Sequence, residues 1–152
     1  MWAWSPPADQ KLAALMETPM RALERSLKAL DKYLSNQVEQ RTTNATVTTL
    51  YTQSVPVNET IVVDGYVSAR RTGGTAGAAN DGAGYTVQFV AKNTAGTAAL
   101  IGSGTVTTLG ESQAGWNVTL SASGGDILVR VTGAIDNNIT WAWHGKRLTV
   151  KD

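Results

Sequence analysis

The chain has 152 residues, a formal net charge of +1, one histidine and no cysteine. A net charge so close to zero argues against a protein that binds nucleic acid mainly through its phosphates, because such proteins carry a basic face. The lack of cysteine excludes disulfide scaffolds, cysteine nucleophiles and most zinc sites, and no apolar run approaches the ~20 residues that a membrane-spanning helix needs.

The composition changes near residue 41. Residues 1–41 contain six Lys or Arg, five Asp or Glu and one threonine, but no glycine. Residues 42–152 contain all 15 glycines and nearly all the threonine. The first composition favours helix, and the second favours strands and turns. The sequence therefore predicts a helical arm over residues 1–41 and a β-domain over residues 42–152.

The arm contains two helix-start signals. Ser5 is followed by two prolines and predicts a short helix over about residues 6–17, because serine caps helices and proline is tolerated in their first turn. Thr18, which is followed by a third proline, repeats the signal. It predicts a break at that point and a second helix over about residues 19–40.

The second predicted helix has one narrow apolar stripe. Its members alternate spacings of three and four, as in the heptad seam of a coiled coil: Met20, Leu23, Leu27, Leu30 and Leu34. The stripe either packs against the chain's own domain, as in an ordinary amphipathic helix, or pairs with identical helices of other subunits. Its narrowness and the basic residues opposite favour pairing. Leucine at both core positions does not choose between a dimer and a trimer.

Trp2 and Trp4 need a separate explanation. Each would expose about 200 Å² of apolar surface if it had no partner. They either pack against the first predicted helix, in the same chain or a neighbouring one, or anchor the chain in a pocket of a larger assembly. Tryptophan is a typical hot-spot residue of such interfaces. The sequence leaves both alternatives open.

From residue 45 onward apolar and polar residues alternate, which is the period of a half-buried strand. The inward positions that this predicts are Ile61, Val63, Gly65, Val67, Ala69, Tyr85, Val87, Phe89, Ala91, Trp116, Val118, Leu120, Ile127, Val129, Val131, Ile139, Trp141 and Trp143. After Gly145 the parity changes, which predicts a β-bulge there and an inward Leu148 and Val150.

Glycine and asparagine turn signals separate these strands, and no helical stretch lies between them. Seven or eight strands without crossover helices predict an antiparallel β-sandwich or jelly roll. The fold class is therefore mainly β with an N-terminal α-helical arm. The glycine-rich segment 71–84 is expected to be a mobile, exposed loop.

The sequence contains no pattern typical of catalysis. His144 is the only histidine, has no cysteine partner and has no nucleophile elbow to serve, so we expect an outward strand residue. The carboxylates of the β-domain stand one by one, mostly in turns, without the paired spacing of general acid–base catalysis. We therefore expect no enzyme, and no catalytic, cofactor-binding or metal-binding residues.

A candidate ligand surface remains. Arg70 and Arg71 form a basic doublet, which is either a solvated rim or a clamp for phosphate or an acidic glycan. Tyr66 and His144 are the other candidate residues, with the segment 71–84. A host receptor or glycan is the ligand that such a surface would take.

Several short runs follow one another through the β-domain in a distinctive order. They are VVDGYVSARR (62–71), YTVQF (85–89), LIGSGTVT (100–107), VRVTGA (129–134) and DNNITW (136–141). In this order they resemble a β-domain that recurs in tailed-bacteriophage virion appendages, at the ends of tail fibres, spikes and related structures. The resemblance covers about 80 residues.

The resemblance implies a non-enzymatic structural protein of the virion: a short fibre, spike or head fibre. It implies a homotrimer, with residues 1–41 as a coiled-coil stalk and the leucine seam at its centre. Trp2 and Trp4 would attach the stalk to another virion protein in the capsid, portal or tail, and the β-domain would be displayed. A host-receptor or glycan-binding adhesin is the alternative, and no cofactor is implied.

Overall fold

The computed structural model describes residues 19–28, 30 and 37–151. Residues 19–28 and 30 are helical. The strands are β1 (Val38–Thr42), β2 (Thr48–Ser54), β3 (Glu59–Gly74), β4 (Gly82–Thr94), β5 (Thr97–Leu100), β6 (Thr105–Glu111), β7 (Asn117–Ser123), β8 (Asp126–Thr132) and β9 (Asn137–Lys151). By contacts the chain divides into two units, Met1–Asn36 and Gln37–Asp152, and each is described by itself. None of the described helical residues belongs to a helix long and apolar enough to cross a membrane.

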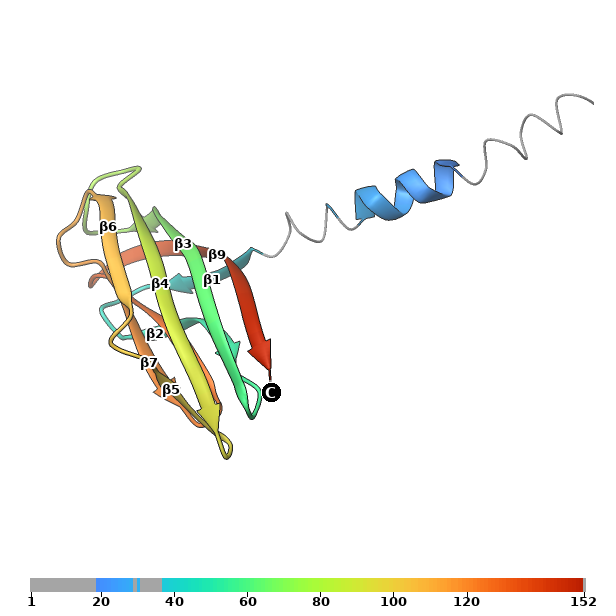
Figure 1. Cartoon of the computed structure of the whole chain (residues 1–152). Coiled ribbons are helices and arrows are strands. Elements are labelled where there is room, and N and C mark those ends of the chain that lie inside the picture. The colour runs from blue at the N-terminus through green and yellow to red at the C-terminus, as the bar shows by residue number, and fades with distance from the viewer. Residues whose placement is uncertain (1–18, 29, 31–36, 152) are drawn as a thin grey trace, which may run out of the picture. The chain divides into compact units, whose positions relative to one another are not determined.

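The strands form two antiparallel sheets (Figure 1). The larger sheet has the order β1-β9-β3-β4-β5, with β6 also paired to β4, and the smaller has the order β2-β8-β7. Every strand pair is antiparallel. No helix connects strands within residues 37–151. The predicted mainly β, antiparallel fold without crossover helices is therefore confirmed.

Both sheets contribute to one hydrophobic core. All the predicted inward positions from Ile61 to Trp143 are buried except Leu120, which is half-buried. The alternation is clearest in β3 and β4, where every second residue from Ile61 to Ala69 and from Tyr85 to Ala91 is buried. This agreement follows from strand geometry, since successive side chains point to opposite faces of a sheet.

The expectation for the end of β9 is wrong. β9 stays in unbroken register with β3 past Gly145, and the register shift of this pair lies between Arg71 and Gly73 instead. Leu148 and Val150 therefore keep the outward parity, and both are exposed. β1 pairs with β9 no further than Trp143, and among the described strands the rest of β9 pairs with β3 alone. This end of β9 is therefore an edge of the sheet, and at an edge the inward positions need not be apolar.

The expected end of the second helix is also wrong. Residues 38–42 form strand β1, which pairs with β9 from Val38 opposite Trp143 to Thr42 opposite Ile139. Inside the core the indole N–H of Trp141 donates a 2.9 Å hydrogen bond to Oγ1 of Thr42. This tertiary pairing outweighs the weak helical preference of the segment. The first predicted helix, Trp2, Trp4 and Leu34 lie outside the described residues.

Tyr85 places a titratable group in the core. It is buried, and its hydroxyl donates a 2.9 Å hydrogen bond to Oε2 of Glu111. Burial, and then the hydrogen bond and negative charge of Glu111, raise the pKa of Tyr85 far above its usual value of 10. The folded protein therefore keeps this proton at pH values where the unfolded chain loses it.

We expect the free energy of unfolding to fall as the pH rises above about 10, because the unfolded chain then binds fewer protons than the folded protein. The free energy of unfolding of the Tyr85→Phe variant should fall less steeply over the same pH range. Guanidinium unfolding between pH 8 and pH 11 measures both slopes. Equal slopes for the two proteins would contradict the assignment.

Candidate functional site

The described helix exposes the apolar stripe that the sequence predicts as an oligomer seam. Met20, Leu23, Leu27 and Leu30 are each between 52% and 55% exposed in the single chain. Their spacing places them on one face of a helix. Four large apolar side chains on one helical face form a surface that a partner can cover.

The larger sheet brings two of the predicted ligand-surface residues together. Tyr66 on β3 lies directly opposite His144 on β9, and both point away from the core. Arg70 has the same parity as Tyr66 but lies four residues further along β3, which is about 13 Å. Its Nη2 donates a 2.7 Å hydrogen bond to Oδ1 of Asn80.

Arg71 lies apart from this group, because its side chain has the opposite parity on β3. Its Nε donates to the carbonyl oxygen of Ala76 (2.8 Å) and to Oδ1 of Asn137 (3.0 Å), and its Nη2 donates to the carbonyl oxygen of Gly74 (2.6 Å). The guanidinium therefore braces the connection between β3 and β4. Sequence reasoning did not foresee this role.

The bounds expected for the exposed loop, residues 71–84, are wrong at both ends. β3 extends to Gly74 and β4 begins at Gly82, so only residues 75–81 lie between the strands. Besides Arg71, Asp81 fastens this connection: its Oδ2 accepts hydrogen bonds from the backbone N–H of Ala78 (2.8 Å) and from Nε2 of Gln113 (2.7 Å).

An apolar row crosses the outward face of the larger sheet. Leu148 lies opposite Val62, and Val62 lies opposite Val90. The backbone N–H of Ile101 donates a 2.8 Å hydrogen bond to the carbonyl oxygen of Val90, which extends the row beyond β4. We call these four residues the outer apolar row. Val90 is half-buried, and the other three are between 45% and 69% exposed.

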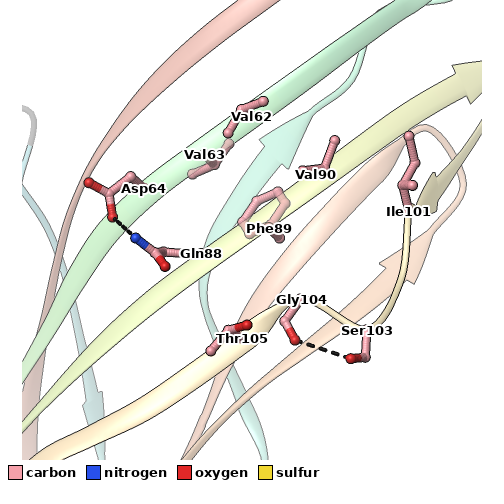
Figure 2. A pocket seen from close by; sticks show the side chains of 10 residues that line it. All are labelled: Val62, Val63, Asp64, Gln88, Phe89, Val90, Ile101, Ser103, Gly104 and Thr105. Carbon is pink, nitrogen blue, oxygen red and sulfur yellow. Dashed lines mark hydrogen bonds between the residues drawn. The ribbon is translucent and has the colours of Figure 1, made fainter.

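A groove of about 520 Å³ runs beside this row, open to solvent (Figure 2). Val62, Val90 and Ile101 line one end of it. At the other end Nε2 of Gln88 donates a 3.1 Å hydrogen bond to Oδ1 of Asp64. The groove is therefore apolar at one end and polar at the other.

Three carboxylates of the β-domain have different, separate partners. Glu59 forms a 2.8 Å ion pair with Lys151, Glu111 accepts from Tyr85, and Asp64 accepts from Gln88. Among residues 19–28, 30 and 37–151, no cluster of three or more acidic or histidine side chains is arranged to hold a metal ion. The described contacts of these acids stabilise strands and turns.

No protein-family model and no curated protein matches the chain. The solved structures that are similar to it include three phage tailspike proteins. The tailspike protein of Acinetobacter phage vB_ApiP_P1 is 12% identical with a TM-score of 0.41, over 75% of this chain and 22% of that one. The tailspike protein gp49 of Acinetobacter baumannii bacteriophage Fri1, a capsular polysaccharide depolymerase, is 10% identical with a TM-score of 0.34, over 75% and 19%. The tailspike protein of Acinetobacter baumannii phage AM24 is 13% identical with a TM-score of 0.34, over 70% and 25%. The matches thus span at most a quarter of each tailspike.

Proposed function

We propose that this protein is a non-enzymatic structural component of a tailed-phage virion: a short fibre, spike or head fibre. In this proposal the helical arm joins copies into a homotrimer and attaches them to another virion protein. The two sheets form a β-sandwich that is displayed. The observation that carries the proposal is the exposed seam of Met20, Leu23, Leu27 and Leu30.

The β-domain supports separate roles for the arm and the displayed domain, because its core is formed within one unit. Trp116 and Trp141 pack together with ring centroids 5.8 Å apart, and Tyr51 of the smaller sheet stacks on Trp143 of the larger at 5.3 Å. A domain with its own core can be attached to an oligomeric arm without contributing any of its strands to the oligomer interface of the arm. The resemblance of its sequence runs to those of phage appendages supports the choice of a virion over other assemblies.

The separate partners of the carboxylates support a non-enzymatic role. Glycosidic bond cleavage uses two carboxyl groups that flank one bond at a defined separation. The contacts of Glu59, Asp64 and Glu111 described above instead join each acid to a different, non-acidic side chain. Their function in this proposal is structural.

A host-receptor or glycan-binding adhesin is the second candidate. The pairing of Tyr66 with His144 on the outward face favours it, because Tyr66 is 55% exposed and an aromatic ring with a polar neighbour is a common recognition element. Binding of the purified chain to host cells or to a glycan array, lost in the Tyr66→Ala variant, would favour this candidate over a purely structural part.

Incorporation into particles tests the first candidate. We expect a Trp2→Ala, Trp4→Ala variant to be absent from purified virions, because tryptophan side chains dominate the anchoring energy of small interfaces. Ile135→Ala, which truncates an exposed apolar side chain in a turn of the β-domain, is the matched control and should be incorporated normally. Quantitative mass spectrometry of the virions measures occupancy, and normal occupancy of the tryptophan variant would contradict the anchor.

A further inference from the structure

We infer that the outer apolar row, Val62, Val90, Ile101 and Leu148, is the surface through which the β-domains of neighbouring copies of this chain contact one another. The inference rests on the proposed assembly of copies through the helical seam. It adds a second interface, in the β-domain, to the one expected in the arm.

The row differs from the row that lies beside it toward His144. The neighbouring row toward His144 consists of Lys146, Asp64 and Gln88, which lie opposite one another in the same register. In the outer apolar row four apolar side chains are adjacent instead. They lie on β9, β3, β4 and the residue that follows β5. Strands are about 4.8 Å apart, so the row is about 14 Å long.

The length of the chain between the two units favours a second copy as the occupant. Leu30 is the last described seam residue, and β1 begins at Val38. Eight residues span at most about 28 Å when fully extended. Pairing of the seams therefore holds the β-domains of different copies close together, at an effective concentration in the millimolar range. At such a concentration a contact as small as this row is sufficient to hold two β-domains together.

The charges beside the row are compatible with contact between copies. Lys146 and Asp64 lie opposite each other in the adjacent row and carry opposite signs. Two copies of a face with both signs side by side can align without placing like charges together. The same arrangement fits a strongly acidic or basic partner poorly.

The absence of cysteine from the chain permits a direct test by thiol labelling. An Ile101→Cys variant places one thiol in the row, and a Thr119→Cys variant places one at an exposed position on β7 of the smaller sheet as the matched control. Each is made in the full chain and again with Leu27→Asn and Leu30→Asn, which break the seam. The maleimide reaction rate is measured in all four proteins, with sedimentation equilibrium in parallel.

We expect the Ile101→Cys thiol to react about tenfold more slowly in the assembled chain than in the seam variant, and the Thr119→Cys thiol to react equally in both. Fast reaction of the Ile101→Cys thiol in an assembled chain overturns the inference and leaves the seam intact. Slow reaction in the seam variant as well also overturns it, because a segment of the same chain then covers the row. A parent chain that sediments as a monomer overturns the proposed assembly itself.

A second variant tests the same surface without a label. Val62→Thr with Leu148→Thr keeps the strand propensity of both exposed positions while removing their apolar character. We expect the concentration at which the oligomer dissociates to rise about tenfold. An unchanged dissociation concentration would overturn the inference.

Discussion

Replacing Gly65 with alanine is expected to lower the free energy of unfolding by about 2–3 kcal/mol, as overpacking of a tight core does. The indole of Trp143 lies over Gly65 on β3. A Cβ atom at position 65 would lie 2.8 Å from both Cζ2 and Cζ3 of this ring and closer still to Cη2. Gly145, which lies opposite Gly65, leaves the same space: a Cβ there would lie 2.5 Å from Cζ2 of Trp143.

The indole cannot move away easily. Trp143 is buried, and its ring stacks on Tyr51 of the smaller sheet at 5.3 Å with an interplanar angle of 20°. An added methyl group therefore shifts either the backbone of β3 or the packing between the two sheets. Glycine at an inward position of a long strand is explained by this close approach.

Gly110→Ala is the matched control for this substitution. Gly110 lies in strand β6 and is exposed, and a Cβ atom added there would meet no atom within 4 Å apart from its chain neighbours. Its replacement should leave the stability unchanged or raise it by a few tenths of a kcal/mol through the unfolded chain. Urea unfolding of both variants measures the difference, and equal stabilities would contradict the close packing of Trp143 on Gly65.

A double-mutant cycle sharpens the same test. Trp143→Ala alone should cost about 3–5 kcal/mol, as truncation of a buried tryptophan does. In the Trp143→Ala background the Gly65→Ala substitution should cost much less, because the indole that it meets is gone. Additive losses would show that the two residues act independently.

In the proposed assembly, replacing Leu27 and Leu30 together with asparagine is expected to convert oligomers into monomers. Each leucine buried in an interface contributes about 1.5–3 kcal/mol, and every copy in the assembly loses two. The dissociation constant should therefore rise by about a thousandfold or more. Sedimentation equilibrium over a range of concentrations measures the mass.

Arg25→Asn with Lys28→Asn is the control for the seam variant. It introduces the same residue twice on the same described helix, at exposed positions outside the stripe, so the intrinsic helix propensity falls similarly. This control should keep the mass of the parent protein. An unchanged mass for the Leu27 and Leu30 variant would remove the assignment of the stripe as an oligomer seam.

The candidate site was partly predictable from the sequence. The alternation over β3 and β9 places Tyr66, Arg70 and His144 outward, because the face of a strand residue follows from its immediate neighbours. The opposite face of Arg71 follows from the same rule, but its contacts with Gly74, Ala76 and Asn137 do not. The contact with Asn137 depends on the start of β9 lying beside the end of β3, where Asn137 is opposite Gly74.

The errors share one cause. The strand of residues 38–42 and the exposure of the apolar Leu148 both depend on which segments lie beside them in the sheet. β1 is held by β9, which lies about a hundred residues further along the chain. Local patterns do not contain such a pairing. The composition of residues 1–41 therefore predicted a longer helix, and the parity of the apolar residues after Gly145 predicted a bulge at that glycine.

By itself the sequence determined the class of fold, the inward face of the main strands and the heptad spacing of the seam. All three follow from local patterns of apolar and polar residues, which can be read from each segment without knowing its neighbours in space. Only the tertiary structure decided the register between distant strands, and with it the Trp143 contact on Gly65 and the outer apolar row. Val62 and Leu148 become one surface because β3 and β9 pair in unbroken register at this point, which depends on the packing of the whole sheet.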